Sequence, residues 1–374
     1  MRAGLSGMLY RGAKVKKKDA KVLLSGNEAV AEGAIQAGCR FYAGYPITPQ
    51  NELTAYMARR MPEAGGVFIQ AESEVAAINM VMGAAATGVR AMTSSSSPGI
   101  SLKQEGISYL AGAELPAVIV NMMRGGPGLG NIWPSQSDYF QATKGGGHGD
   151  YHCLVLAPSR VQEAFDLMFS AFYLADTYRM PTMILGDGML GQVMEPLSAR
   201  VPPGAAVGKY AKASLAASKP WALTGCSGRK PNVIKSFYLK DGDLEEFNLR
   251  LQKKYSLVRA KETRYEGMML KDARLVLVAY GTMARICAAV VRQLRSEGIK
   301  AGLIRPMTLW PFPVEAFLPR VSPARSYLVA EMSYGQMLED VKLALNGRAK
   351  VGFIGRAGGG FPREEAIAAE ARKL

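Results

Sequence analysis

Glu74 is the side chain best placed by the sequence to do chemistry. It follows Ser73 in the first turn of an expected helix and precedes the small residues Ala76 and Ala77. A carboxylate in a first helical turn often serves only as a favourable partner of the helix dipole, and Glu72 fits that interpretation. Glu74 could instead point into a sheet crevice, where a carboxylate shielded from water can share a proton with a ligand nitrogen. Both interpretations stay open at this point.

A rigid loop precedes this segment, between an expected strand and an expected helix. It reads Gly44-Tyr45-Pro46-Ile47-Thr48-Pro49. Its two prolines restrict the backbone, and Thr48 offers a hydroxyl group between them. Loops at this edge of an open α/β sheet commonly bind ligands, although a simple turn before a helix would use the same residue types.

Two further loops carry polar groups after strands. The serine-rich loop 93–99 includes Ser96, and its hydroxyls either cap the helix that begins near Pro98 or line the crevice. Arg124 directly precedes the glycine-rich loop 125–130. That loop matches neither GxGxxG nor GxxxxGK, so it predicts neither a dinucleotide fold nor a P-loop. An arginine beside a flexible loop is suited to a substrate carboxylate.

Metal chemistry is not expected from this chain alone. The four cysteines, at positions 39, 153, 226 and 287, are scattered, and there are only two histidines. His148 lies within the glycine-rich segment 144–150, where glycines allow close approach to a bound molecule. It is a possible catalytic residue, with a structural imidazole in a loop as the alternative.

The elements that position these residues follow a doubly wound α/β pattern. Short apolar strands alternate with helices, as in parallel sheets that are covered on both faces. We expect strands at 22–24, 40–44, 66–70, 90–93, 116–121, 152–156 and 181–185, with helices at 27–37, 51–60 and 73–86. A second α/β unit begins at Ala273, after an expected helix that spans Asp243 to Glu266.

The predicted organisation has four parts. They are a basic extension over 1–20, an α/β domain over 21–195, a basic connecting segment with a helix over 196–270 and a second α/β domain over 271–374. The net charge of +15 is concentrated in the two basic segments. No nucleic-acid-binding motif accompanies this charge, so acidic proteins or an anionic cofactor such as coenzyme A are the expected partners, with a solvated basic surface that has no partner as the alternative. Neither a secretory signal nor a run of about 18 apolar residues is present, so a cytoplasmic protein without membrane association is expected.

Taken together and in this order, these loops resemble the alpha subunit of 2-oxoacid:ferredoxin oxidoreductases. The segment 45–49 resembles the family's YPITP loop, the segment that begins at Glu72 resembles its ExExxA motif, and Arg124 lies where the family places its substrate arginine. Loops 93–99, 125–130 and 145–150 most resemble the branched-chain (3-methyl-2-oxobutanoate) and 2-oxoglutarate types. Residues 305–313 resemble the transketolase-like C-terminal domain of the same subunit.

The resemblance implies a thiamine-diphosphate pyrimidine-binding domain followed by a transketolase C-terminal-like domain. It implies catalytic roles for Glu74, Thr48 and Arg124. It further implies cofactor contacts from Glu74, Tyr45, Pro46, Ile47 and Ser96. In this scheme Glu74 shares a proton with the ring nitrogen of the aminopyrimidine, while Thr48 and Arg124 orient the substrate. The implied reaction is oxidative decarboxylation of a 2-oxo acid, with 3-methyl-2-oxobutanoate as the expected substrate, to acyl-CoA and CO2 with ferredoxin reduction.

The same resemblance implies that other chains supply what this one lacks. Gly186-Asp187-Gly188 resembles the start of the family's metal and diphosphate motif, but no Asn-Asn pair follows it anywhere. Asp187 is therefore predicted to be a turn or helix-cap residue. A beta subunit with the diphosphate-binding domain would hold the diphosphate and Mg²⁺. Gamma and ferredoxin-like delta subunits would complete the complex, with iron–sulfur clusters on partner chains and with ferredoxin and coenzyme A as further partners.

Three alternatives remain at this point. They are a 2-oxoglutarate-specific alpha subunit, a self-contained transketolase-type enzyme, which would need the missing diphosphate motif, and a non-catalytic assembly subunit that keeps the fold without the chemistry.

Overall fold

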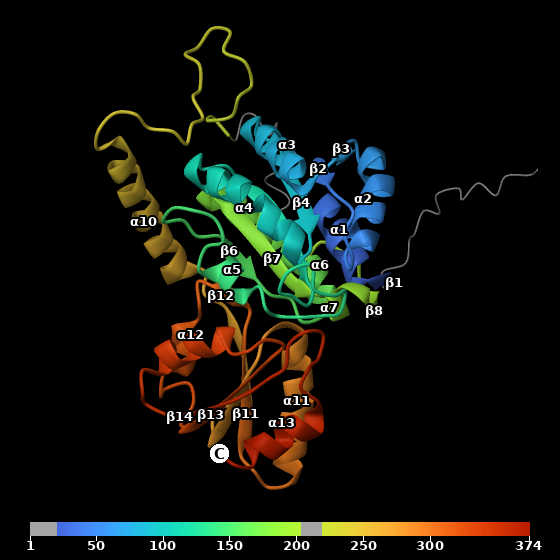
Figure 1. Cartoon of the computed structure of the whole chain (residues 1–374), viewed down its shortest axis with the longest axis vertical. Helices are drawn as coiled ribbons and strands as arrows, with labels where there is room; N and C mark the ends of the chain where they lie inside the picture. The colour runs from blue at the N-terminus through green and yellow to red at the C-terminus, as the bar shows by residue number, and fades with distance from the viewer. Residues whose placement is uncertain (1–20, 203–218) are drawn as a thin grey trace, which may run out of the picture.

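Two mixed sheets, of seven and five strands, organise the computed structural model, which describes residues 21–202 and 219–374 (Figure 1). The basic extension predicted over residues 1–20 and residues 203–218 of the predicted connecting segment lie outside these ranges. The five-stranded sheet comes from the second half of the chain and the seven-stranded sheet mainly from the first, and the five-stranded sheet lies below the seven-stranded one in Figure 1.

The first half of the chain alternates strands and helices, as its apolar runs predict. Its elements are β1 (Val22–Ser25), α1 (Gly26–Gln36), β2 (Phe41–Gly44), α2 (Asn51–Glu63), β3 (Val67–Gln70), α3 (Glu74–Ala86), β4 (Ala91–Ser95), α4 (Ser97–Gly112), β5 (Ala117–Met123), α5 (Tyr139–Thr143), β6 (Leu154–Leu156), α6 (Val161–Tyr178), β7 (Pro181–Asp187), α7 (Gly188–Gln192) and β8 (Met194–Leu197). Strand β1 pairs with β8 in a separate two-stranded antiparallel sheet.

The second half begins with the long helix predicted from Asp243, followed by a strand that the sequence does not predict. Its elements are α10 (Asp243–Lys261), β9 (Tyr265–Met268), β10 (Leu275–Val278), α11 (Gly281–Ser296), β11 (Ala301–Pro306), β12 (Thr308–Trp310), the 3-10 turn η1 (Val314–Phe317), β13 (Ser326–Glu331), α12 (Gln336–Leu345), β14 (Lys350–Gly355) and α13 (Glu364–Ala371). The sheet order is β14-β13-β10-β11-β9, with only β9 antiparallel.

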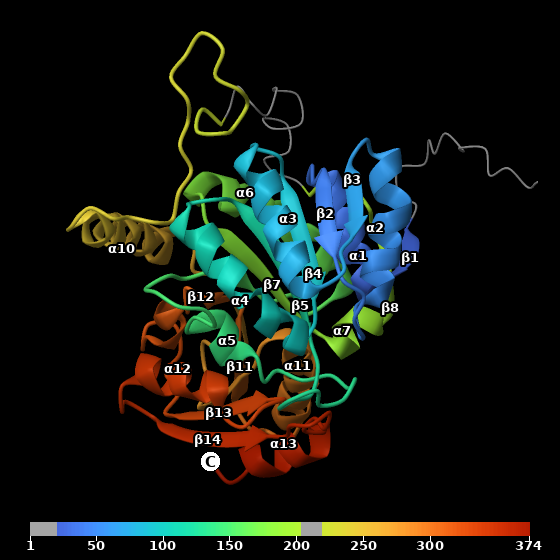
Figure 2. The ribbon, with the colours of Figure 1, turned by 45° about the horizontal axis from the view of Figure 1, so that its top comes forward.

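The seven-stranded sheet has the order β12-β6-β7-β5-β4-β2-β3. Six of its strands are parallel, and β12 joins antiparallel to β6 from the second half of the chain. Helices α3 and α4 pack together on one face, and α1 packs against α2 and α6 on the other (Figure 2). The strands β5, β4, β2 and β3 are neighbours, so the loops that leave their carboxyl ends meet at one edge.

One sequence expectation is wrong in detail. The helix predicted to run from Asp243 to Glu266 ends at Lys261, and Glu266 lies on β9 opposite Arg305 of β11. The two side chains form an ion pair across the strands, with Arg305 Nη2 2.9 Å from Glu266 Oε2. The charged residues that resemble a solvated helix face therefore lie partly on an edge strand. This strand, β9, comes from the predicted connecting segment and belongs to the five-stranded sheet.

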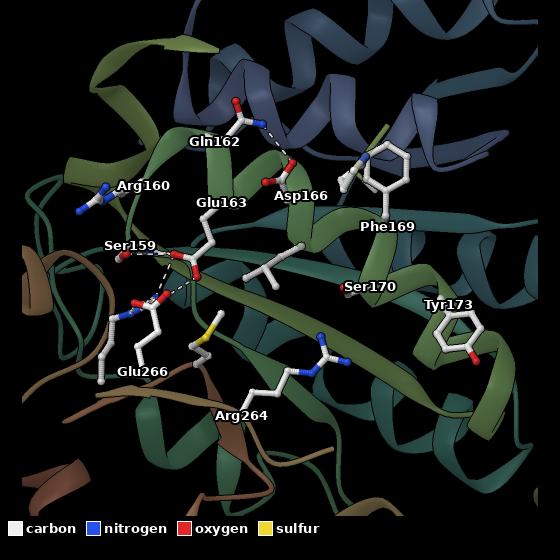
Figure 3. Close-up of a pocket in the computed structure, with 14 residues that line it drawn as sticks. Ser159, Arg160, Gln162, Glu163, Asp166, Phe169, Ser170, Tyr173, Arg264 and Glu266 are labelled. Carbon is white, nitrogen blue, oxygen red and sulfur yellow. Dashed lines mark hydrogen bonds and ion pairs between the residues drawn. The ribbon is translucent and has the colours of Figure 1, made fainter. Parts of the chain in front are cut away.

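A charged cluster joins the two halves beside a cavity of about 810 Å³ between α6 and the β9–β11 pair. Arg305 donates through Nη1 and Nη2 to the two carboxylate oxygens of Glu163 on α6, at 2.9 and 2.8 Å. Figure 3 shows Glu163 and Glu266 converging at this side of the cavity. The Arg305 side chain is only 6% exposed, so its charge depends on these two carboxylates.

The two carboxylates should differ in their effect on stability. We expect Glu163→Ala to lower the free energy of unfolding by roughly 2–4 kcal/mol, because it leaves a buried arginine without its bidentate partner. Glu266→Ala should cost less than about 1 kcal/mol, because that side chain is 65% exposed. Chemical denaturation of both variants measures the difference, and equal losses would contradict this assignment.

Candidate active site

Glu74 is held at the carboxyl edge of the seven-stranded sheet by the local structure of its own helix. Ser73 adopts an extended conformation and its side chain accepts a hydrogen bond from the Ala76 amide, so α3 begins at Glu74. The Glu74 side chain is only 3% exposed. The capping serine thus fixes the direction in which the carboxylate leaves the helix, and the carboxylate enters the sheet edge rather than solvent.

Three residues of the neighbouring strand and helix surround this carboxylate. Ser95 Oγ, at the end of β4, donates to Glu74 Oε1 at 2.5 Å. Lys103, on α4, forms an ion pair with Glu74 Oε2 and is fully buried. Gly99 lies so close that a Cβ atom at this position would be 2.2 Å from Glu74 Oε1. The glycine therefore makes room for the carboxylate, while the serine and the lysine stabilise its charge.

Arg124 and Thr48 lie together at the ends of β5 and β2. Arg124 Nη1 donates to the backbone oxygen of Thr48 at 2.9 Å, and its Nη2 donates to the backbone oxygen of Leu129 at 2.9 Å. Arg124 is 7% exposed, and its Nε has no hydrogen-bond partner within the described ranges. The guanidinium thus holds the 45–49 loop against the glycine-rich loop and keeps donors that are not used by the protein.

Asp138 links the start of α4 to β5 beside Arg124. It accepts hydrogen bonds from Ser97 Oγ at 2.6 Å and from Asn121 Nδ2 at 2.9 Å. Ser97 Oγ in turn accepts from the Arg124 backbone amide at 3.0 Å. Burial raises the pKa of Asp138, and the two side-chain donors oppose that shift. The start of α4 and the end of β5 are therefore fixed to each other through one half-buried carboxyl group.

The remaining predicted contact residues occupy the same edge with different exposure. Ser96 Oγ is fully buried and has no hydrogen-bond partner among the described residues, although Ser96 is the N-cap residue of α4. Tyr45 and Pro46 are exposed, and Ile47 is half-buried. The 45–47 segment thus presents apolar surface above the buried polar groups.

His148 lies away from Glu74. It is exposed, its backbone oxygen accepts from Ser108 Oγ at 2.7 Å, and its ring meets Tyr109 edge to face. Ser108 is nine residues beyond Gly99 on α4, which is about 14 Å along a helix. The predicted catalytic histidine is therefore not brought together with the carboxylate.

Asp187 takes the capping role that the sequence predicts. Its Oδ1 accepts from the amides of Met189 and Leu190, both at 3.0 Å, at the start of α7. Its carboxylate is thus committed to the protein backbone. Within residues 21–202 and 219–374, no group of three or more His, Cys, Asp or Glu side chains is arranged to hold a metal ion.

Sequence reasoning missed Lys103, Ser95, Asn121 and Asp138. Ser95 belongs to a loop that was recognised, but its individual role was not. Lys103 had a detectable signal, because it follows Gly99 by four residues and so lies on the same face of α4. A lysine within a helix usually belongs to a solvated face, so this spacing alone does not predict that Lys103 is buried.

These groups suit the aminopyrimidine half of thiamine diphosphate. A buried carboxylate matches a basic ring nitrogen, and the partnerless Ser96 Oγ and Arg124 Nε supply further polar contacts at the same edge. For the diphosphate half, the candidate Asp187 caps α7, and no Asn-Asn pair exists in the sequence. The residues present therefore fit one end of the cofactor.

Comparison with known proteins identifies the family. Residues 32–221 match the family described as pyruvate flavodoxin/ferredoxin oxidoreductase, thiamine diphosphate-binding, and residues 273–367 match core domain II of pyruvate:ferredoxin oxidoreductase. The ketoisovalerate oxidoreductase subunit VorB of Methanothermobacter marburgensis is 51% identical over 90% of this chain and 93% of its own length. The chain belongs to the 2-oxoacid:ferredoxin oxidoreductase family.

Other members and a structural neighbour agree. The 2-oxoglutarate synthase subunit KorA of Methanothermobacter thermautotrophicus is 37% identical over 92% of this chain and 96% of its own length. The 2-oxoglutarate:ferredoxin oxidoreductase of Magnetococcus marinus, solved with 2-oxoglutarate, coenzyme A and succinyl-CoA bound, superposes with a TM-score of 0.81 at 25% identity. That match covers 95% of this chain and 65% of the other. A split-gene transketolase, at 14% identity and a TM-score of 0.57 over 94% of this chain and 97% of its own, shares the fold.

Several sequence predictions are thereby confirmed. The chain is a subunit of an oxidoreductase of this family, it contains the thiamine-diphosphate-binding domain, and its fold has the predicted α/β class. The transketolase-like character of the fold is confirmed as well. No helix in the described part of the chain is long and apolar enough to cross a membrane.

A pair of glycine substitutions tests how tightly Glu74 is packed. A Cβ atom at Gly99 would lie 2.1 Å from Ser95 Oγ and 2.2 Å from Glu74 Oε1, so Gly99→Ala should displace the carboxylate. We expect at least about a tenfold loss of activity in the assembled complex. Gly83→Ala is the matched control, because it lies in α3 with nothing within 4 Å of its Cβ position. It should keep full activity and gain up to about 1 kcal/mol of stability. Equal activity of the two variants would contradict the packing argument.

Proposed function

We propose that this chain is the alpha subunit of a thiamine-diphosphate-dependent oxidoreductase that converts 3-methyl-2-oxobutanoate to acyl-CoA and CO2 with reduction of ferredoxin. The observation that carries the proposal is the 51% identity, over 90% of the chain, to a ketoisovalerate oxidoreductase subunit. The subunits named for 2-oxoglutarate are 34–38% identical over a similar length. Specificity for 2-oxoglutarate is the second candidate.

Glu74 is the residue on which the proposed chemistry depends. Thiamine diphosphate supplies the carbon nucleophile for the oxo carbon and the electron sink that allows CO2 to leave. Glu74, shielded from water, shares a proton with the aminopyrimidine ring nitrogen. Arg124 and Thr48 lie at the ends of neighbouring strands and orient the oxygens of the substrate.

Partner chains complete the proposed site. A beta subunit holds the diphosphate and Mg²⁺, and gamma and ferredoxin-like delta subunits complete the complex, whose iron–sulfur clusters lie on partner chains. Coenzyme A accepts the acyl group, and the complex works in the cytoplasm. Support for a docking partner near the site comes from the 125–133 loop, where Leu129, Ile132 and Trp133 are 80, 55 and 62% exposed. Exposed apolar residues gathered beside a site are typical of protein–protein contacts.

Activity of the purified complex with a panel of 2-oxo acids tests the substrate. We expect kcat/KM for ferredoxin reduction with 3-methyl-2-oxobutanoate to exceed that with 2-oxoglutarate by at least about tenfold, since the two differ by an apolar branch against a charged group. The opposite preference would establish the second candidate.

Replacing Glu74 separates a catalytic subunit from an assembly subunit. Glu74→Gln keeps the size of the side chain and removes its charge, so it should lower kcat by at least about a hundredfold in the reconstituted complex. Size-exclusion chromatography should show an intact complex. Unchanged activity would mean that the fold is kept without the chemistry.

Calorimetry of the isolated chain tests the division of the cofactor site. The isolated chain should bind thiamine diphosphate weakly or not at all, and affinity should rise when the partner subunit is added. Tight Mg²⁺-dependent binding by the chain alone would overturn this division.

A further inference from the structure

Lys103 is a buried charge that the proposed chemistry does not use. Its side chain has no exposed surface, and its ammonium group forms an ion pair with Glu74 Oε2. Burial by itself lowers the pKa of Lys103 to about 7, and the adjacent carboxylate of Glu74 opposes that shift and favours the ammonium form. A fully buried lysine is rare in proteins and is retained as a cation only beside a counter-ion. The position of Lys103 therefore depends on Glu74, and the state of Glu74 depends on Lys103.

The face of α4 that meets α3 is built around this pair. Gly99, Lys103 and Gly106 follow one another at spacings of four and three residues, which place them on one side of the helix. Gly106 packs against Ile78 of α3, since a Cβ atom there would be 2.5 Å from Ile78 Cγ2. The two helices thus approach closely at both glycines and leave the lysine side chain with one polar partner between them.

Without the ammonium group of Lys103 beside it, the buried Glu74 would favour its protonated, neutral form. A carboxyl group removed from water favours its neutral form, and a neutral Glu74 would keep the proton that it is meant to share. The ammonium group and the hydroxyl of Ser95 both favour the ionised form. Two carboxylate oxygens offer about four acceptor positions, and the one hydrogen bond to them among the described residues comes from Ser95 Oγ, so positions remain for a ligand N–H.

We propose that Lys103 is a positioning residue of the thiamine site, whose ammonium keeps Glu74 ionised so that the shared proton rests on the aminopyrimidine nitrogen. The proposed step moves only one proton, between Glu74 and the aminopyrimidine nitrogen, and no other bond forms or breaks. The lysine touches neither cofactor nor substrate and acts entirely through Glu74. This inference rests on the proposed function, because it requires the aminopyrimidine to meet Glu74.

The test compares Lys103→Met with a second buried lysine in the reconstituted complex. Lys219 is 4% exposed and pairs with Asp176 at 2.6 Å, away from Glu74. Lys219→Met therefore removes the same kind of ion pair outside the site. Calorimetry measures thiamine diphosphate affinity in the presence of Mg²⁺, circular dichroism measures the band of the imino form of the aminopyrimidine, and thermal melting measures stability.

We expect Lys103→Met to bind the cofactor roughly 10–100-fold more weakly, the factor that corresponds to a hydrogen bond to a charged group, and to lose the imino band. Lys219→Met should lower the melting temperature and leave both affinity and band unchanged. Lys103→Gln keeps a donor without the charge and should also lose the band, which gives a second reading if the methionine variant folds poorly.

Glu74→Gln supplies the last comparison. In that background Lys103→Met should weaken cofactor binding no further, because the charge on which it acts is gone. Wild-type affinity and band in Lys103→Met, or an equal loss with and without Glu74, would overturn the role of Lys103. A wild-type complex that binds no thiamine diphosphate would instead contradict the proposed function, and with it the role that depends on it.

Discussion

The carboxylate of Glu74 is buried, and the proposed chemistry requires it to be ionised as well; much of the local structure fits that double requirement. Burial alone would neutralise the group, so donors have to be brought to it. Ser95 comes from the adjacent strand, and Lys103 comes from the helix that follows that strand. Gly99 allows that helix to approach closely enough for both contacts. A serine, a glycine and a lysine within nine residues of sequence thus act on one carboxylate from another helix.

The strand order brings the remaining groups to the same place. Strands β5, β4, β2 and β3 are neighbours, so Arg124, Ser95, the 45–49 loop and Glu74 leave adjacent strands at one edge. Arg124 then ties two of these loops together by donating to Thr48 and Leu129. Segments separated by up to 80 residues in the chain are therefore held by the sheet rather than by local contacts.

Local patterns in the sequence predict much of this arrangement, whereas contacts between distant segments could not be predicted. The capping serine before Glu74 and the loops after apolar strands are local features, and they placed Glu74, Thr48 and Arg124 correctly at a strand edge. The antiparallel addition of β12 to β6 and of β9 to β11 depends on pairing between distant segments, which periodicity does not reveal. The burial of Lys103 could not be predicted for a related reason, because it depends on the carboxylate of Glu74, 29 positions earlier in the chain. His148 was favoured by its glycine neighbours, yet tertiary structure places it near the other end of α4.

The burial of Glu74 also bears on the proposed division of the active site between chains. A group proposed to share a proton needs a dry environment that is already formed, and this chain surrounds Glu74 with its own strand, helix and counter-ion. A diphosphate and its metal instead need an exposed, strongly charged cradle, and Asp187, the best candidate for one, is engaged in capping α7. The aminopyrimidine and the diphosphate of the cofactor therefore need different surroundings, one shielded from water and one exposed and charged. In the proposed complex these two environments lie on different chains, and exposed apolar loops such as 125–133 are where the chains would meet.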